Sequence, residues 1–141
     1  MAAGSFSYFA IFCAAIASFV FGAAWYGILS KQWMAAQGWT QADMLDASGK
    51  PKVPVVPMVI SFVAELIMAL VLYGVLAHVA KSGMNVRAGL FTGFVCWFGF
   101  VITTLVTNHA YGRAKAALTV IDGGHWLGVL LLQGVVLGLL G

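Results

Sequence analysis

The chain has 141 residues, of which 62% are hydrophobic and only 8% are charged, and its mean hydropathy is +1.00. This composition leaves too little polar surface to solvate a water-soluble globule of that length. The formal net charge of +3 is explained by membrane topology and affinity for anionic lipids, so we expect membrane lipids and no nucleic acid as partners.

Four continuous apolar runs divide the chain, at about residues 6–30, 58–80, 88–110 and 123–141. About 20 apolar residues cross the hydrocarbon core as an α-helix, so each run predicts one transmembrane helix. The runs lack the alternation of a membrane β-barrel, and the interfacial loop 31–57 is too short to fold alone. The sequence therefore predicts an all-α fold, an integral membrane four-helix bundle that forms a single transmembrane domain over residues 1–141.

The first connection, residues 31–57, contains its own local structure. Thr40 and Asp43 are spaced like a capping box, which predicts a short interfacial helix over residues 41–47 between the first two membrane helices. Trp33 and Trp39 flank this segment, and indole rings favour the headgroup region. We interpret the segment as an interfacial anchor, with ligand binding as the alternative.

Small residues recur at four-residue spacing inside the predicted helices. They are Ala14, Ser18, Gly22, Gly89, Gly93, Gly124, Gly128, Gly134 and Gly138. Such ridges let helix backbones approach closely in lipid. The last helix has two of them, so the second can serve a neighbouring copy or another subunit. The alternative is that glycine is simply common in membrane helices.

Glu65 is the only acidic residue clearly inside a predicted span. An unpaired carboxylate there is costly, so we expect Glu65 to face the bundle and to be protonated, paired or next to water. Thr103 and Thr107 on the third helix and Gln133 on the fourth lie at similar depth, which predicts an intramembrane polar cluster. One interpretation is a proton-titrating or cation-binding site, and the other is a neutral Glu65 that fixes helix register.

A second set of polar and aromatic residues surrounds the loop between the third and fourth helices. Its members are Asn108, His109, Tyr111, Arg113, Asp122, His125 and Trp126. The histidines and the aspartate are suitable zinc ligands, but their spacing matches no established metal pattern. We expect Asp122 to cap the fourth helix with His125 in its first turn, and we expect neither a metal nor a cofactor.

The loops also predict an orientation, because Lys and Arg favour the cytoplasmic side. One side has five such residues, which are Lys31, Lys50, Lys52, Arg113 and Lys115. The other side has only Lys81 and Arg87. We therefore expect a multi-pass protein of the cell inner membrane with both termini in the periplasm.

Several segments together resemble a known family. In order they are Phe21-Gly-Ala-Ala-Trp-Tyr-Gly, Lys31-Gln-Trp-Met, Gly38-Trp-Thr-Gln-Ala-Asp and Ile121-Asp-Gly-Gly-His-Trp-Leu-Gly. This set is similar to the bacterial membrane proteins catalogued as domain of unknown function 1761, over nearly the whole chain. The resemblance implies a four-helix integral membrane protein and brings no established activity with it.

Two classes of function remain, and no catalytic motif supports an enzyme. The glycine ridges favour an accessory or structural subunit that self-associates or docks to a larger membrane complex. Glu65 favours a homo-oligomeric, proton-linked transporter or channel for a small molecule or ion. From the sequence we prefer the accessory subunit.

Overall fold

The computed structural model describes residues 6–141, and their regular structure is helical apart from one isolated bridge between Leu45 and Pro51. In chain order the elements are α1 (Tyr8–Ile28), α2 (Ser30–Gln37), η1 (Gln41–Met44), α3 (Val55–Val79), α4 (Val86–Cys96), η2 (Trp97–Val101), α5 (Ile102–Tyr111) and α6 (Ala116–Leu140). Since α4, η2 and α5 are continuous, four helices are long and apolar enough to cross a membrane. The predicted all-α membrane bundle is confirmed.

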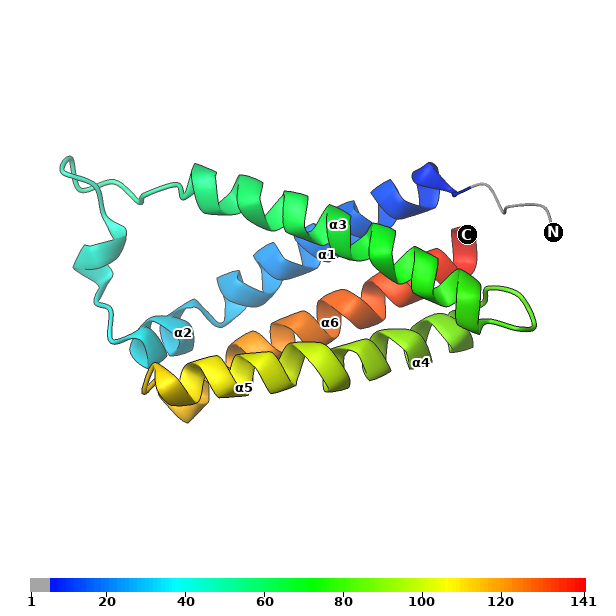
Figure 1. Cartoon of the computed structure of the whole chain (residues 1–141). Helices are drawn as coiled ribbons and strands as arrows, with labels where there is room; N and C mark the ends of the chain where they lie inside the picture. Colours follow the sequence, from blue (N-terminus) through cyan, green and yellow to red (C-terminus); the bar gives the residue numbers. More distant parts are fainter. Residues whose placement is uncertain (1–5) are drawn as a thin grey trace.

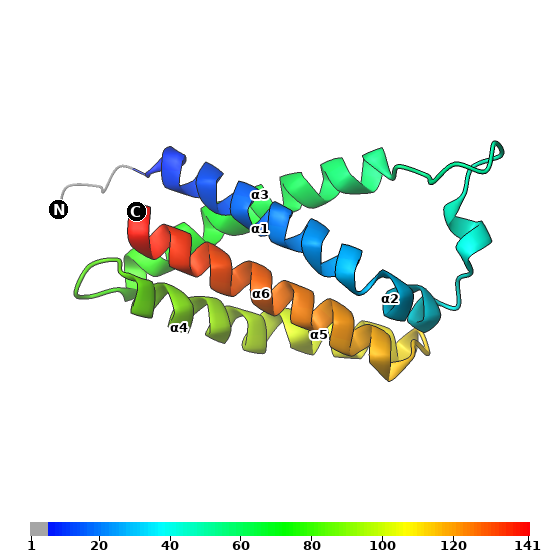
Figure 2. The same cartoon turned by 180° about the vertical axis from the view of Figure 1, so that it is seen from behind.

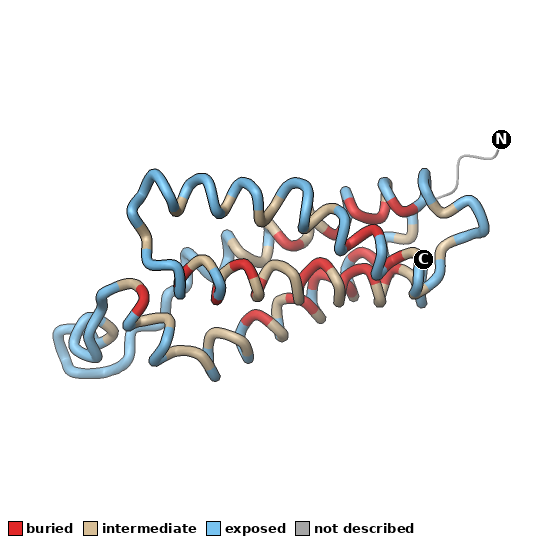
Figure 3. Tube along the Cα trace, turned by 90° about the horizontal axis from the view of Figure 1, so that it is seen from below, coloured by how far each residue is buried: buried red, intermediate tan, exposed pale blue. Residues whose placement is uncertain are grey.

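The four spans alternate in direction, and α6 lies at the centre of the bundle. Figures 1 and 2 show α6 between α1 on one side and α4 with α5 on the other, and the start of α1 and the end of α6 lie at the same end of the molecule. We call the opposite end, which carries the long connection between α2 and α3, the loop end. In Figure 3 the buried positions follow the helix faces that meet in the interior.

The last helix begins earlier than the sequence predicted. It starts at Ala116 rather than at residue 123, because the preceding turn is closed within Gly112 to Lys115. Arg113 adopts a left-handed conformation there, with φ 55°. Alanine is the best helix former, and Ala116 and Ala117 extend the helix toward this turn.

The connection after α1 contains more helix than expected. The capping box between Thr40 and Asp43 is confirmed, but the helix that it caps is the short 3-10 turn η1 and does not extend to residue 47. The additional helix α2 precedes it and ends at Gly38, whose left-handed φ of 74° favours glycine.

Glycines set the closest contact in the bundle, between α4 and α6. A β-carbon on Gly89 would collide with the backbone of Gly134, and a β-carbon on Gly134 would collide with the backbone of Gly89. Further along the same seam, a β-carbon on Gly93 would lie 2.5 Å from the carbonyl oxygen of Leu130. These two helices therefore pack backbone against backbone, which small residues permit.

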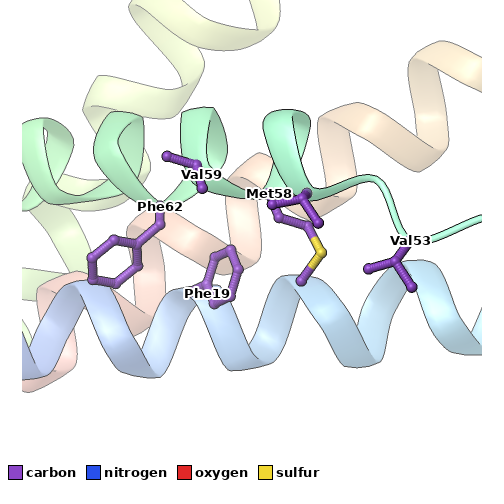
Figure 4. Close-up of a pocket in the computed structure, with 6 residues that line it drawn as sticks. Phe19, Val53, Met58, Val59 and Phe62 are labelled. Atoms are coloured by element: carbon purple, nitrogen blue, oxygen red, sulfur yellow. The ribbon is translucent and has the colours of Figure 1, made fainter.

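The N-terminal half of α3 diverges from α1 toward the loop end (Figure 1). Residues 51–60 are all exposed. An apolar groove of about 340 Å³ lies between the two helices. Figure 4 shows the rings of Phe19 and Phe62 and the side chain of Met58 in this groove. The buried residues of α1 and α3 therefore lie mainly from the level of Glu65 toward the end at which α1 begins, where Ala14, Ala69 and Leu72 share one cluster.

Candidate functional site

Glu65 lies in the interior of the bundle, and its side chain is only 1% exposed. It is about 15 Å along α3 from Val55, close to the middle of that helix. The Ser18 hydroxyl of α1 lies 2.6 Å from Oε2 of Glu65. The same hydroxyl lies 3.1 Å from the carbonyl oxygen of Ala15. No Lys or Arg occurs within α1, α3 or α6, so the partners of this carboxyl are neutral.

Gln133 of α6 joins the other two helices at the same depth. Its side-chain amide donates to the Ser18 hydroxyl at 3.0 Å and to the backbone carbonyl of Glu65 at 2.9 Å. Its side-chain oxygen is buried and has no hydrogen-bond partner among residues 6–141. A buried acceptor without a donor is unusual in folded proteins. We refer to Ser18, Glu65 and Gln133 as the central polar cluster.

His125 lies on the loop-end side of this cluster and is only 5% exposed. A β-carbon on Gly22 would lie 2.7 Å from Nε2 of His125 and 3.8 Å from Oε1 of Glu65. Because Gly22 has no side chain, the imidazole of His125 and the carboxyl of Glu65 can both lie close to this position. Within the described part of the chain, Nδ1 of His125 is buried and has no partner.

A second polar group lies nearer the loop end, where α1, α5 and α6 meet. The Tyr26 hydroxyl donates to Oδ1 of Asp122 at 2.8 Å. Nε2 of His109 lies 4.0 Å from the other carboxylate oxygen of Asp122. Nδ1 of His109 lies 2.9 Å from the Thr119 hydroxyl. We refer to Tyr26, Asp122, His109 and Thr119 as the loop-end cluster.

The prediction that Thr103 and Thr107 join Glu65 is wrong. Both side chains are exposed on the outer face of α5, and each donates to a backbone carbonyl of its own helix, Gly99 or Thr103. With Asn108 they line a shallow depression on that outer face. Of the predicted intramembrane cluster, the structure brings together only Glu65 and Gln133.

The predicted capping role of Asp122 is also wrong, because α6 begins at Ala116 and Asp122 lies inside the helix. His125 consequently lies deeper than a first-turn position. The remaining members of the predicted loop group do not surround one site. Tyr111 is 89% exposed, Asn108 and Arg113 are exposed, and Trp126 is half-buried.

A metal site finds no support among residues 6–141, where no three His, Cys, Asp or Glu side chains come close enough together to hold an ion. The nearest approximation is the pair of His109 and Asp122, and His125 packs against the Tyr26 ring without completing a group of three. The two loop carboxylates, Asp43 and Asp46, bind locally. Asp43 accepts from the Thr40 backbone at 2.6 Å, and Asp46 accepts from the Ser48 hydroxyl at 2.6 Å.

The predicted packing residues all lie at contacts within this one chain. Ala14 and Ser18 are fully buried. In the first ridge of α6, a β-carbon on Gly124 would meet the Trp25 ring, and one on Gly128 would meet the Phe21 ring. In the second ridge, Gly134 meets Gly89, and Gly138 meets Asn85. Neither ridge is left free for a neighbouring molecule.

Sequence analysis missed the roles of Ser18 and Tyr26, which belong to these clusters, and of Trp97, which joins η2 to α6. Ser18 was considered only as a small packing residue, although it was the one hydroxyl in an otherwise apolar ridge. Tyr26 was considered only as part of an aromatic motif. Trp97 donates its indole N–H to the carbonyl oxygen of Gly123 at 2.9 Å, and the π-helical turn η2 that carries it has no obvious sequence signal.

The chain was compared with known families, proteins and structures. A family model described as "Protein of unknown function (DUF1761)" matches residues 9–138. No curated protein and no solved structure matches the chain. The match covers almost the whole chain, including the central polar cluster and the loop-end cluster, and the chain belongs to this family of proteins of unknown function.

Proposed function

We propose that this protein is a proton-linked membrane transporter or channel for a small molecule or ion, and that Glu65 is the group that binds and releases the proton. One observation carries the proposal: Glu65 is 1% exposed and has no Lys or Arg in the spans α1, α3 and α6, and the neighbouring side chains of Gln133 and His125 each have a buried polar atom without a partner among residues 6–141. Ionisable residues inside a membrane are costly and usually functional.

The hydrogen-bond geometry accommodates both protonation states of Glu65. A serine hydroxyl has one proton and two lone pairs, and the Gln133 amide can only donate to it. If Glu65 is ionised, Ser18 donates its proton to the carboxylate. If Glu65 is protonated, the carboxyl donates to Ser18, and Ser18 donates to the Ala15 carbonyl. Rotation of one hydroxyl therefore adapts the cluster without movement of a helix.

The arrangement of α3 supports a transport cycle. Its N-terminal half is exposed and separated from α1 by the apolar groove, whereas Glu65 connects it to α1 and α6 through Ser18 and Gln133. Segments with few buried contacts are the ones that move. A change in the charge of Glu65 alters the contact between the movable helix and the rest of the bundle.

A second candidate is an accessory or structural subunit that self-associates or docks to a larger membrane complex. It is favoured by the outer face of α5, which exposes Thr103, Thr104, Thr107 and Asn108 within a membrane span. It loses the support of the glycine ridges, because these are filled by contacts inside the chain. We therefore place it second. Native mass spectrometry of the gently extracted protein tests it, since a stoichiometric foreign subunit supports this candidate.

The setting that we propose is the cell inner membrane, with membrane lipids around a homo-oligomer. The excess of Lys and Arg at the loop end supports a cytoplasmic position for that end and a periplasmic position for both termini.

Proteoliposomes with a trapped pH dye test transport. An inside-acid gradient is imposed, and sodium, potassium, small organic cations and small organic acids are added outside one class at a time. We expect one class to dissipate the gradient in wild-type vesicles and not in Glu65→Gln vesicles. Thr103→Val is the control, because its hydroxyl faces outward and bonds only to its own helix.

Equal responses of wild-type and Glu65→Gln vesicles contradict a proton-carrying role for Glu65. The absence of any response from wild-type vesicles, together with a foreign subunit in native mass spectra, favours the accessory subunit.

A further inference from the structure

We infer that Asp122, Tyr26 and His125 form a proton path from the loop end of the bundle to Glu65, with His109 at its entrance. This inference rests on the proposed function, in which Glu65 binds and releases a proton. It adds that the proton enters from the loop end of the bundle, and it names the residues that carry the proton to Glu65.

The outer part of the path is the loop-end cluster. The side chains of His109 and Asp122 are 18% and 17% exposed, so both are open at the surface of the bundle near the loop end. Their ring nitrogen and carboxylate oxygen are 4.0 Å apart, which places an imidazole, a group able to carry a proton, beside the carboxylate. The Tyr26 hydroxyl, 2.8 Å from the opposite carboxylate oxygen, extends the path inward.

The middle of the path is the pair of Tyr26 and His125. Their ring centroids are 4.8 Å apart. His125 is buried among Phe21, Tyr26 and Trp126, and its Nδ1 has no partner in the described residues. An imidazole can take up a proton on one nitrogen and release one from the other. Because Nδ1 of His125 has no hydrogen-bond partner among the described residues, it is free to accept a proton. A histidine with only a structural role would have this buried nitrogen hydrogen-bonded.

The inner part of the path crosses Gly22. A β-carbon on this residue would lie 2.7 Å from Nε2 of His125 and 3.8 Å from Oε1 of Glu65. Any larger residue would separate the imidazole from the carboxyl. The other groups facing Glu65 are neutral, namely Ser18 from α1 and Gln133 from α6.

The opposite side of Glu65 is packed mainly by apolar side chains, which favours the loop-end side for the path. Between the central polar cluster and the chain termini, the core consists of residues such as Ile11, Ala14, Leu72, Leu76 and Leu137. Tyr73 of α3 is the titratable side chain in that core cluster.

The other elements around Glu65 add no charged group near it. The only Lys or Arg in α4 is Arg87, in its first turn and exposed, and the ionisable thiol of Cys96 is at the other end of that helix. The route from Glu65 through His125, Tyr26 and Asp122 therefore leads to the loop end of the bundle.

Transfer of one proton along this route is balanced. A proton that arrives on the Asp122 carboxylate passes to the Tyr26 oxygen as the hydroxyl proton of Tyr26 passes to His125. The imidazolium then releases the proton from its other nitrogen to the Glu65 carboxylate. The net result is a neutral Glu65 and one proton removed from the loop end.

The rate at which Glu65 is protonated tests the path. Glu65 is the only glutamate in the chain, so glutamate labelled with ¹³C at its side-chain carboxyl identifies its infrared band in the intact protein in lipid. After a rapid acid jump, we expect Tyr26→Phe and Asp122→Asn to slow the rise of this band by at least about tenfold, with an unchanged end point. Tyr111→Phe is the matched control, because Tyr111 is 89% exposed and belongs to no cluster.

Each outcome is distinct. Slow protonation in Tyr26→Phe and Asp122→Asn, with a normal rate in Tyr111→Phe, supports the path. Wild-type rates in both path variants overturn it and leave the proposed function intact. A shifted end point with an unchanged rate also overturns it, because the residues then only tune Glu65. If the wild-type band does not respond to pH at all, the proposed function fails and the path fails with it.

Discussion

The hydroxyl of Ser18 lies 2.6 Å from Oε2 of Glu65, and this contact joins residues 47 positions apart in the chain. It is the polar link between the middle of α1 and the middle of α3. Because Gln133 donates to the same hydroxyl, one serine oxygen holds three membrane helices at a common depth. Its removal affects both the stability of the bundle and the environment of Glu65.

Replacement of Ser18 by alanine is therefore expected to lower the free energy of unfolding by about 1–2 kcal/mol. Interhelical hydrogen bonds in membranes are modest in energy, and Glu65 and Gln133 each lose one in this variant. Denaturation in lipid–detergent mixtures measures the change. Thr103→Val removes an outward hydroxyl and should cost less than about 0.5 kcal/mol. Equal effects of the two substitutions would show that the central polar cluster adds nothing to stability.

The contact between Gly89 and Gly134 predicts a larger effect. Gly134→Ala forces a β-carbon into the backbone of α4, so we expect a loss of about 2 kcal/mol or more. Gly99→Ala is the matched control, because no atom outside its own stretch of helix lies within 4 Å of a β-carbon at Gly99. If Gly134→Ala were as stable as Gly99→Ala, the close approach of α4 and α6 would be wrong.

Gly22 predicts a local effect on His125. In Gly22→Ala the new β-carbon would lie 2.7 Å from Nε2 of the imidazole, so the ring must shift away from Glu65. We expect the ring ¹⁵N resonances of His125 to move in NMR spectra. Gly27→Ala, in the same helix and with open space around it, should leave them in place. Unchanged His125 resonances in Gly22→Ala would contradict the placement of this ring.

We predict that the stability of the folded connection between α2 and α3 depends on pH. Hydrogen bonds from the Thr40 backbone and hydroxyl hold the pKa of Asp43 below its ordinary value. Those from the Ser48 hydroxyl and the Lys50 backbone do the same for the pKa of Asp46. Because each carboxyl has a lower pKa in the folded state than its ordinary value of 3.8, its ionised form stabilises the folded loop at pH values above 3.8. This stabilisation is lost as the pH falls through the folded-state pKa.

Hydrogen exchange at the backbone amides of Thr40 and Lys50 measures this change. Protection should hold at neutral pH and fall below about pH 4, and Asp43→Asn should remove much of the pH response at Thr40. Protection at Thr40 that persists at low pH, or is unaffected by Asp43→Asn, would contradict the role of this carboxylate.

Orientation is predicted by the loop charges and is tested by labelling. In a variant without Cys13 and Cys96, single cysteines at Ser48 and Ser82 lie at opposite ends of the bundle, and both positions are exposed. In intact cells an impermeant thiol reagent should label Ser82→Cys and not Ser48→Cys. Labelling of Ser48→Cys alone would invert the topology and place the loop-end cluster in the periplasm.

Much of the fold was predictable because a bilayer permits few structures. Backbone groups in lipid must be hydrogen-bonded internally, so apolar runs of this length become helices and their number sets the topology. The depths of Glu65 and Gln133 also followed from the rise per residue of a helix. The start of α6 was misjudged because Lys115 and Asp122 looked like a polar loop, although α6 already begins at Ala116.

The inward face of the third span was not predictable, for a physical reason. Cys96 packs against the core, and a regular helix would carry Thr103 inward with it. The π-helical turn η2 lies between them and adds a residue to one turn, which rotates everything after it by about 100°. Ile102 and Leu105 therefore contact α6 near Gly123, and Thr103 and Thr107 face outward.

The central claim is that Glu65 changes its protonation state in the membrane. Because the chain has a single glutamate, the infrared band of a ¹³C-labelled glutamate carboxyl reports on this residue alone, in lipid and at equilibrium. As the pH is raised across the range in which the protein stays folded, we expect the protonated band to disappear and the carboxylate band to grow by the same amount. A protonated band that keeps its full intensity across this range would contradict the account and make Glu65 a neutral residue that fixes helix register.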